Sequence, residues 1–467
     1  MKELREYAQL SEWTPKNSNH RKLYDMALSG FSRQEAREVF QISDNYFNVL
    51  YKEVKDQLAD GVLTNNFRNW DRVKRIQFGI RKQYETAMML IGTGKMAAGI
   101  PLARAAVRKA EKNGMYPIAL ELSRKLRRYY STTAPDLKYY KYYTEKQWFY
   151  NQEVQWELEA EDVFFEFGLQ LRKGTPSPLI PERLAELAEI PAKSNRFHHV
   201  RFLTAVLYYQ VKRQEAKMLA TCEAALQHFE NINDLPYIIK FSFYFRAIAS
   251  HLSRREFAQA ETLINKSLIG PARGKHNWQI IMIHRALLGF HSRKPAIALD
   301  AWHKATKLPK KFQTEQVKER WQIVRAYLEL YDIEMPGKWR LNRFMNSMPV
   351  SSSDKTGNHL SILIVEMLHL LKTKKYEHYR YRCERLEAYI KEHLKGKGLE
   401  RPVAFLRLLQ CIARGGFQIG HIHAKSKRYL QTISGSHPSI GADVREIEVV
   451  PFEELWRMAI GFLTPKT

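Results

Sequence analysis

The sequence predicts an all-α fold. Apolar residues recur at spacings of three and four along nearly the whole chain of 467 residues, which is the pattern of amphipathic helices. Alternating stretches rich in Val, Ile and Thr are scarce, and only Arg445 to Val450 fits a strand. Pairs of helical segments return about every 40 residues, and this repetition is typical of a helical-hairpin solenoid.

Composition and charge limit the classes of protein to which this chain can belong and the kind of partner it can bind. Hydrophobic residues make up 45% of the chain and aromatic residues 12%, which excludes a disordered or fibrous protein. The net charge of +26 favours a polyanion or an acidic protein surface as the partner. The start has no apolar signal segment and no apolar run approaches about 20 residues, so we expect a cytoplasmic protein without membrane insertion. Three widely separated cysteines indicate reduced core thiols: Cys222, Cys383 and Cys411.

Residues 1–62 resemble a helix-turn-helix segment. Ser32 would cap a first helix, residues 41–43 would form the turn, and Asn45 to Tyr51 would begin a recognition helix. A DNA reader needs cations near the phosphates, yet residues 1–60 carry a net charge of about −1. A DNA-reading segment and a structural or protein-docking helix trio therefore both remain open.

Residues 67–175 are expected to hold N-terminal repeats followed by a long helix. Gly92 to Lys95 is similar to a phosphate loop, but Met89 and Met96 occupy the positions that require Gly and Ser or Thr, so a hairpin turn is predicted. No helix breaker follows Pro135 up to residue 172, which predicts one long helix or two coaxial ones. This helix should end at the breakers that follow: Gly174, Pro176 and Pro178.

Residues 180–433 are expected to form the C-terminal repeats. Five segments share an aromatic helix, a tight basic or Gly turn and a second helix, which we expect to begin at Glu215, Phe257, Pro295, Tyr376 and Phe417. Their separations are 42, 38, 81 and 41 residues. Because 81 is two periods, a degenerate unit should lie between, with Val317 to Ile333 as its first helix. Met96 would begin the equivalent helix about three periods before Glu215.

The segment Arg255 to Ala260, with Leu263, Ile264 and Leu268, resembles the second helix of a tetratricopeptide-like repeat. Phe290 to Ala301 is a looser copy. The resemblance covers about residues 67 to 432 and implies a right-handed solenoid that binds a partner and performs no chemistry. An irregular multi-helix domain is the alternative. Residues 434–467 form a tail whose helical segment PFEELWRMAIGFL should dock on the last repeat.

No motif predicts catalysis, a cofactor or a metal. Glu366 and His369 have the spacing of a di-iron ligand pair, but a second copy is missing. Neither His421 with His423 nor His198 with His199 can converge on one ion without further ligands. The row Glu153, Glu157, Glu161 and Asp162 is expected to be a solvated acidic face or the partner of a basic repeat.

Two stretches combine cations with aromatic rings, as contacts to phosphates and stacking on unpaired bases would require. Alternatively, the tyrosines fill the core and the cations only solvate the surface. The candidate partner-binding residues of the first stretch are Arg124, Lys125, Arg127, Arg128, Lys138, Tyr140, Lys141 and Tyr143. Those of the second are Lys374, Lys375, Arg380 and Arg382.

The sequence as a whole predicts a non-catalytic scaffold or adaptor that binds a protein or a nucleic acid, RNA or DNA, through a basic surface. The alternative is a DNA-binding regulator with an N-terminal helix-turn-helix and a repeat domain that senses a peptide or protein. That architecture is known among bacterial peptide-responsive regulators.

Overall fold

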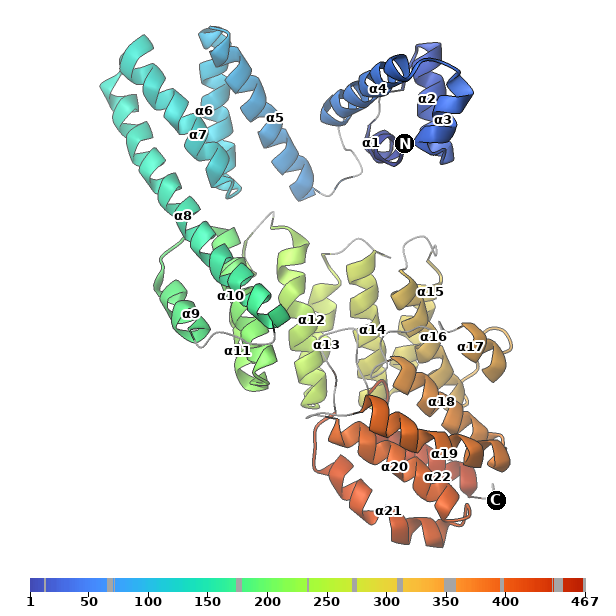
Figure 1. The fold of residues 1–467 in the computed structure, drawn as a ribbon. Coiled ribbons are helices and arrows are strands. Elements are labelled where there is room, and N and C mark those ends of the chain that lie inside the picture. Colours follow the sequence, from blue (N-terminus) through green and yellow to red (C-terminus); the bar gives the residue numbers. More distant parts are fainter. Residues whose placement is uncertain are drawn as a thin grey trace. The chain divides into compact units, whose positions relative to one another are not determined.

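The computed structural model describes residues 1–11, 14–64, 70, 72–173, 179–232, 235–270, 275–308, 314–347, 358–394, 399–438, 440 and 448–464. This part of the chain is all-helical and contains no strand (Figure 1), which confirms the predicted class. Most of the candidate strand Arg445 to Val450 lies outside the described residues, and its last three residues form no strand. Contacts divide the chain into two units, residues 1–144 and 145–467.

The first unit begins with four helices that share a small core around Leu4, Leu23 and Phe47. Their bounds are α1 (Lys2–Leu10), α2 (Ser18–Ser29), α3 (Arg33–Phe40) and α4 (Asp44–Thr64). Ser32 and Glu35 form a capping box at the start of α3. Gln41, with a φ of 49°, ends it. The predicted cap at Ser32 and the turn at residues 41–43 are confirmed, and the helix expected from Asn45 begins one residue earlier, at Asp44.

Two tight turns connect the next three helices of this unit: α5 (Arg72–Gly92), α6 (Met96–Lys112) and α7 (Tyr116–Arg128). Gly94 and Gly114 adopt left-handed conformations, with φ of 75° and 65°, which glycine reaches without steric cost. Residues 92–95 therefore form the predicted hairpin turn. A π-helical turn, η1 (Tyr129–Thr133), leads to α8 (Leu137–Lys173). This single helix of 37 residues confirms the predicted long helix, and its expected breakers at 174–178 lie outside the described residues.

The second unit contains helices packed in neighbouring pairs (Figure 1). After α9 (Ile180–Glu189), the pairs are α10 (Asn195–Val211) with α11 (Glu215–Phe229), α12 (Tyr237–Ser253) with α13 (Phe257–Ser267), α14 (His276–His291) with α15 (Pro295–Thr306), α16 (Glu315–Leu330) followed by the short α17 (Leu341–Ser347), α18 (Asn358–Lys372) with α19 (Tyr376–His393), and α20 (Glu400–Arg414) with α21 (Ile419–Ser434). The predicted starts at Glu215, Phe257, Pro295 and Tyr376 are confirmed. The start at Phe417 is wrong by two residues, because Gly415 and Gly416 lengthen the turn and Phe417 itself has a φ of 63°.

The same turn geometry recurs after the first helix of each pair. In the turn after α12, Arg255 has a φ of 61° and the N–H of Glu256 donates to the carbonyl of His251 at 2.8 Å. This hydrogen bond, from the residue after the left-handed one to the carbonyl five positions earlier, defines a Schellman motif. The left-handed residues are 38 to 42 positions apart: Arg213, Arg255, Arg293, Asp332 and Lys374. The repeat of about 40 residues is thus present in the turns, and Asp332 marks the degenerate unit.

The core of the second unit lies around the first helices of the pairs, several of which are buried on most sides. Ile264 and Trp302 are buried in this core, and Phe257, Leu299 and Tyr389 are partly buried and pack against it. The tail helix α22 (Phe452–Leu463) packs on α18, α20 and α21. Phe452 stacks on Phe405 at 4.5 Å between ring centroids. The predicted docking of the tail is confirmed.

Candidate functional site

The cations of the first basic stretch lie at the end of α7 and the start of α8. Arg124, Lys125 and Arg128 are exposed and Arg127 is partly buried. Among the described residues, no carboxylate forms an ion pair with any of these four. On α8, Lys138 and Lys141 are exposed. Three of the α7 cations lie in the last turn of the helix, where the helix dipole also favours positive charge.

Positive charge is concentrated in this part of the chain. Residues 72–144 contain sixteen Lys and Arg and four Asp and Glu, almost half of the net charge in less than a sixth of the length. The exposed face of α7 includes none of the large hydrophobic side chains that are exposed elsewhere. This face is therefore suited to a charged partner and lacks the apolar anchors of a typical protein interface.

The tyrosines beside these cations are mostly used inside the protein. Tyr143 is buried and its ring stacks on Tyr130 with centroids 5.9 Å apart. Tyr130 also stacks on Tyr139 at 4.8 Å, and Arg104 donates to the Tyr139 hydroxyl at 3.0 Å. Desolvation raises the pKa of Tyr143 to about 12. The ring of Tyr143 is thus not free to stack on a base, and Tyr140 is half-buried.

A cavity of about 570 Å³ adjoins the π-helical turn. Its walls combine small apolar side chains with two tyrosines and one carboxylate, and π-helical turns often occur at functional sites. Asp136 accepts a hydrogen bond from the N–H of Tyr139 at 3.0 Å, so this carboxylate also caps α8. The lining residues are Met96, Ala97, Ile100, Pro101, Tyr129, Tyr130, Ala134, Pro135 and Asp136.

The second basic stretch divides between surface and core. Lys374 and Lys375 are exposed in the turn between α18 and α19. Arg380 is exposed on α19 and lies over the ring of Phe417 at 5.5 Å. Arg382 pairs with the buried Glu366, with Nη2 and Oε1 2.7 Å apart. Arg382 is thus engaged in neutralising a core carboxylate, and three of the four predicted cations remain at the surface.

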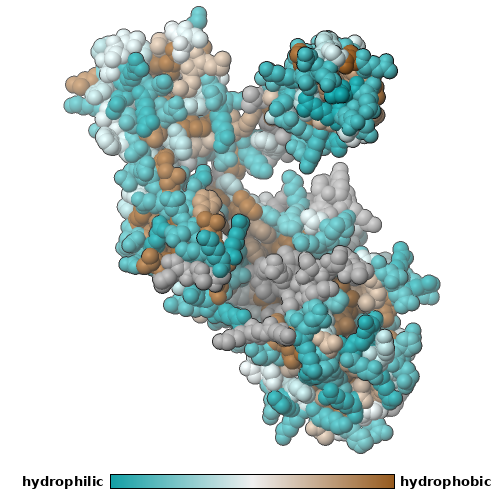
Figure 2. Space-filling model, viewed as in Figure 1, coloured by the Kyte–Doolittle hydropathy of each residue, from teal (hydrophilic) through white to brown (hydrophobic). Residues whose placement is uncertain are grey.

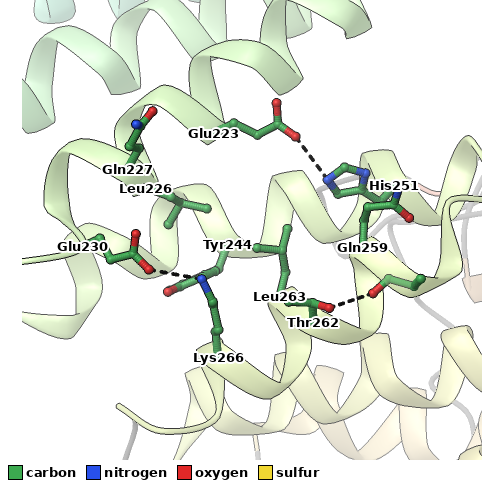
Figure 3. Close-up of a pocket in the computed structure, with 11 residues that line it drawn as sticks. Glu223, Leu226, Gln227, Glu230, Tyr244, His251, Gln259, Thr262, Leu263 and Lys266 are labelled. Carbon is green, nitrogen blue, oxygen red and sulfur yellow. Dashed lines mark hydrogen bonds and ion pairs between the residues drawn. The ribbon is translucent and has the colours of Figure 1, made fainter.

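A groove of about 450 Å³ lies between α11 and α13 over α12 (Figure 3). His251 of α12 is held between two carboxylates: Glu256 accepts from Nδ1 at 2.7 Å and Glu223 lies 3.4 Å from Nε2. This hydrogen bond lowers the pKa of Glu256. At the other end Lys266 pairs with Glu230 at 3.1 Å. The groove has polar ends and an apolar middle, and sequence reasoning missed it because its residues come from three helices.

The acidic row on α8 binds the residues around the start of α10, which Ser194 caps. Both carboxylate oxygens of Glu153 accept from the N–H of Lys193, and one also accepts from Ser194 at 2.8 Å. Glu157 accepts from the Ser194 hydroxyl and Glu161 pairs with Arg196. Glu153 and Glu157 are buried, so the expectation of a solvated face is wrong for them. The three glutamates instead bind Lys193, Ser194 and Arg196 around the start of α10, where the helix dipole favours negative charge.

The N-terminal segment presents apolar side chains where a DNA reader would present cations. Val39 of α3 and Tyr46 and Val49 of α4 are exposed within a surface that is otherwise mostly hydrophilic in the view of Figure 2. Arg37 pairs with Asp44 at 3.1 Å and Arg33 donates to Asn48 at 2.8 Å. Both arginines are therefore already engaged within the segment.

The described residues show no cluster of three His, Cys, Asp or Glu side chains that could hold a metal. His369 packs on Trp339, and burial lowers its pKa. None of the described helices combines the length and apolar character needed to cross a membrane. Comparisons with protein-family models, curated proteins and solved structures find no match to this chain.

Proposed function

We propose that this protein is a non-catalytic scaffold, a right-handed solenoid of tetratricopeptide-like helical hairpins, that binds the phosphate backbone of a nucleic acid. The observation that carries the proposal is the exposed group Arg124, Lys125 and Arg128 on α7, which has no carboxylate partner among the described residues. The group lies within a stretch of sixteen cations and four carboxylates. Phosphate contacts supply most of the affinity in sequence-independent binding. An acidic protein would need apolar anchors that this face of α7 lacks.

The recurring Schellman turns and paired helices support a repeat scaffold. The alternative, a DNA-binding regulator, has less support. Its recognition helix presents Tyr46 and Val49 at the surface, and its nearest arginines pair within the segment.

The proposal is tested by measuring the affinity of the full chain for a fluorescent 20-nucleotide single strand, as RNA and as DNA, over a range of salt concentrations. Three phosphate contacts would give a log–log slope of about −2, at about −0.7 per contact. The triple variant Arg124→Glu, Lys125→Glu and Arg128→Glu should lose binding and keep its stability, because exposed charges contribute little to folding.

A matched control reverses three exposed lysines of the N-terminal segment: Lys2, Lys16 and Lys52. This control should bind the oligonucleotide like the unmodified protein. If the control loses binding and the α7 variant keeps it, the regulator is supported in place of the scaffold. Binding that is insensitive to salt and survives the α7 reversal would reject the phosphate contact.

A further inference from the structure

The turns of the second unit carry cations at a position that normally favours glycine. Arg213, Arg255, Arg293 and Lys374 have φ between 54° and 61°, a left-handed conformation that is strained for a residue with a side chain. Each has a second cation directly beside it: Lys212, Arg254, Lys294 and Lys375. The sequence therefore keeps pairs of cations at four equivalent turns although glycine would strain the backbone less.

These turns lie on one edge of the unit. The first helices α10, α12, α14, α16 and α18 each pack against the next in this series. Each ends in the same Schellman turn, and after α10, α12, α14 and α18 the next helix packs back along the first. The C-terminal ends of the first helices therefore face the same side, and cation pairs lie along that side at four of the five turns. At the other turn, after α16, Asp332 takes the left-handed position and pairs with Lys372 at 2.6 Å. We call this row of turns the turn edge.

Helix α22 of the same chain contacts two turns of the turn edge through adjacent carboxylates. Glu453 of α22 pairs with Arg255, with Oε1 and Nη2 2.7 Å apart, and Glu454 lies 3.5 Å from Nε of Arg293. These two adjacent carboxylates reach two adjacent turns. Phe452 and Leu455 beside them are buried against the unit. An acidic, amphipathic segment is thus already seated on part of the edge.

Other cations of the turn edge are exposed and have no carboxylate partner among the described residues: Lys212, Lys294, Lys374 and Lys375. Val211, next to Lys212, is also exposed. The turn after α10 thus combines exposed cations with an exposed apolar side chain, and the turn after α18 adds two further exposed cations.

We propose that the turn edge binds an acidic, amphipathic segment of a partner protein, in the way in which it binds Glu453 and Glu454 of its own chain. A polypeptide is favoured over a nucleic acid because α22, which already contacts the turn edge, carries carboxylates next to apolar side chains that are buried against the unit. This site uses other residues than the phosphate contact of α7, so each can fail without the other.

The test uses a fluorescein-labelled peptide of three Glu-Glu-Leu-Trp repeats and its Gln-Gln-Leu-Trp counterpart, with fluorescence anisotropy on the full chain. The acidic peptide should bind, and the neutral one should bind at least tenfold more weakly. The variant Lys212→Glu, Lys294→Glu and Lys374→Glu changes one exposed cation in each of three turns and should lower affinity at least tenfold. Glu454→Gln, which frees Arg293, should raise it.

The control variant reverses three exposed lysines away from the turns: Lys275, Lys307 and Lys427. It should bind the acidic peptide within twofold of the unmodified protein. The proposal is overturned if the acidic peptide does not bind, or if both variants lose affinity equally. It is also overturned if the turn variant loses affinity for a single-stranded oligonucleotide while peptide binding is unchanged, because the edge would then be a phosphate site.

Discussion

Arg401 of α20 and Glu448, which precedes α22, form a bidentate ion pair that is almost completely buried. Nε donates to Oε2 at 2.8 Å and Nη2 donates to Oε1 at 2.7 Å. Nη2 also lies 2.6 Å from Glu453, and Nη1 donates to the carbonyl of Ser436 at 2.9 Å. One guanidinium therefore joins the end of the last hairpin, the segment before α22 and α22 itself.

Arg401→Met should destabilise the second unit by about 3–5 kcal/mol, because it leaves the carboxylate of Glu448 buried without its partner. Desolvation already raises the pKa of Glu448 against the opposing effect of Arg401. The double variant Arg401→Met and Glu448→Leu removes both charges and should recover most of the loss. Urea denaturation measures both free energies of unfolding, and a double variant as unstable as the single one would contradict this account.

Gly289→Ala should destabilise the protein by about 1–3 kcal/mol through overpacking. A Cβ at Gly289 would lie 2.6 Å from the backbone N of Ala298, so α14 and α15 would have to separate. Gly168 on α8 is the control, since its Cβ would meet nothing within 4 Å. Gly168→Ala should stabilise by about 0.5–1 kcal/mol. Thermal unfolding of the two variants should shift in opposite directions.

Lys374→Gly should stabilise the protein by about 0.5–1 kcal/mol. Glycine removes the strain of the left-handed conformation, and this gain exceeds the extra conformational entropy that glycine loses on folding. Lys375 is the matched control because its φ is −85°. Lys375→Gly should bring no gain. Chemical denaturation of the pair separates the backbone effect from the loss of one positive charge, and equal gains would refute the strain at Lys374.

The free energy of unfolding should fall in acid because of His291, which contacts the segment before α22. Burial lowers the pKa of His291 to about 4. The positive charges of Arg401 and Arg255 lower it further, whereas Glu453 and the hydrogen bond to the carbonyl of Glu448 act in the opposite direction. The unfolded chain takes up the proton first, so this contribution to stability is present above pH 6.5 and is lost as the pH falls toward 4.

His291→Gln keeps a donor for the carbonyl of Glu448 and removes the titration. Its free energy of unfolding should therefore fall less between pH 6.5 and 4 than that of the unmodified protein, measured by urea denaturation at each pH. His421 is exposed on α21, and His421→Gln is the control for the loss of one histidine. A His291→Gln profile parallel to the original would disprove the role of His291.

The hairpin boundaries could be predicted from the sequence because apolar spacing and turn residues are local signals. Glu215, Phe257, Pro295 and Tyr376 begin their helices as predicted. The candidate site could be predicted from the sequence only in part. The charge and spacing of Arg124, Lys125 and Arg128 indicate an exposed cationic face, but no local pattern distinguishes Arg382, which faces Glu366, from Arg380, which faces solvent.

By itself the sequence determined the helical class, the period near 40 residues, the long helix and the excess of positive charge, since each follows from neighbouring residues or from composition. Only the tertiary structure decided the partners of charged and aromatic side chains. It buried Tyr143 against Tyr130 and joined Glu153 to the backbone of Ser194, the residue that caps α10. It also brought Glu453 to Arg255 across 198 positions. These contacts depend on how helices distant in sequence pack, and such packing leaves no periodic signal in the chain.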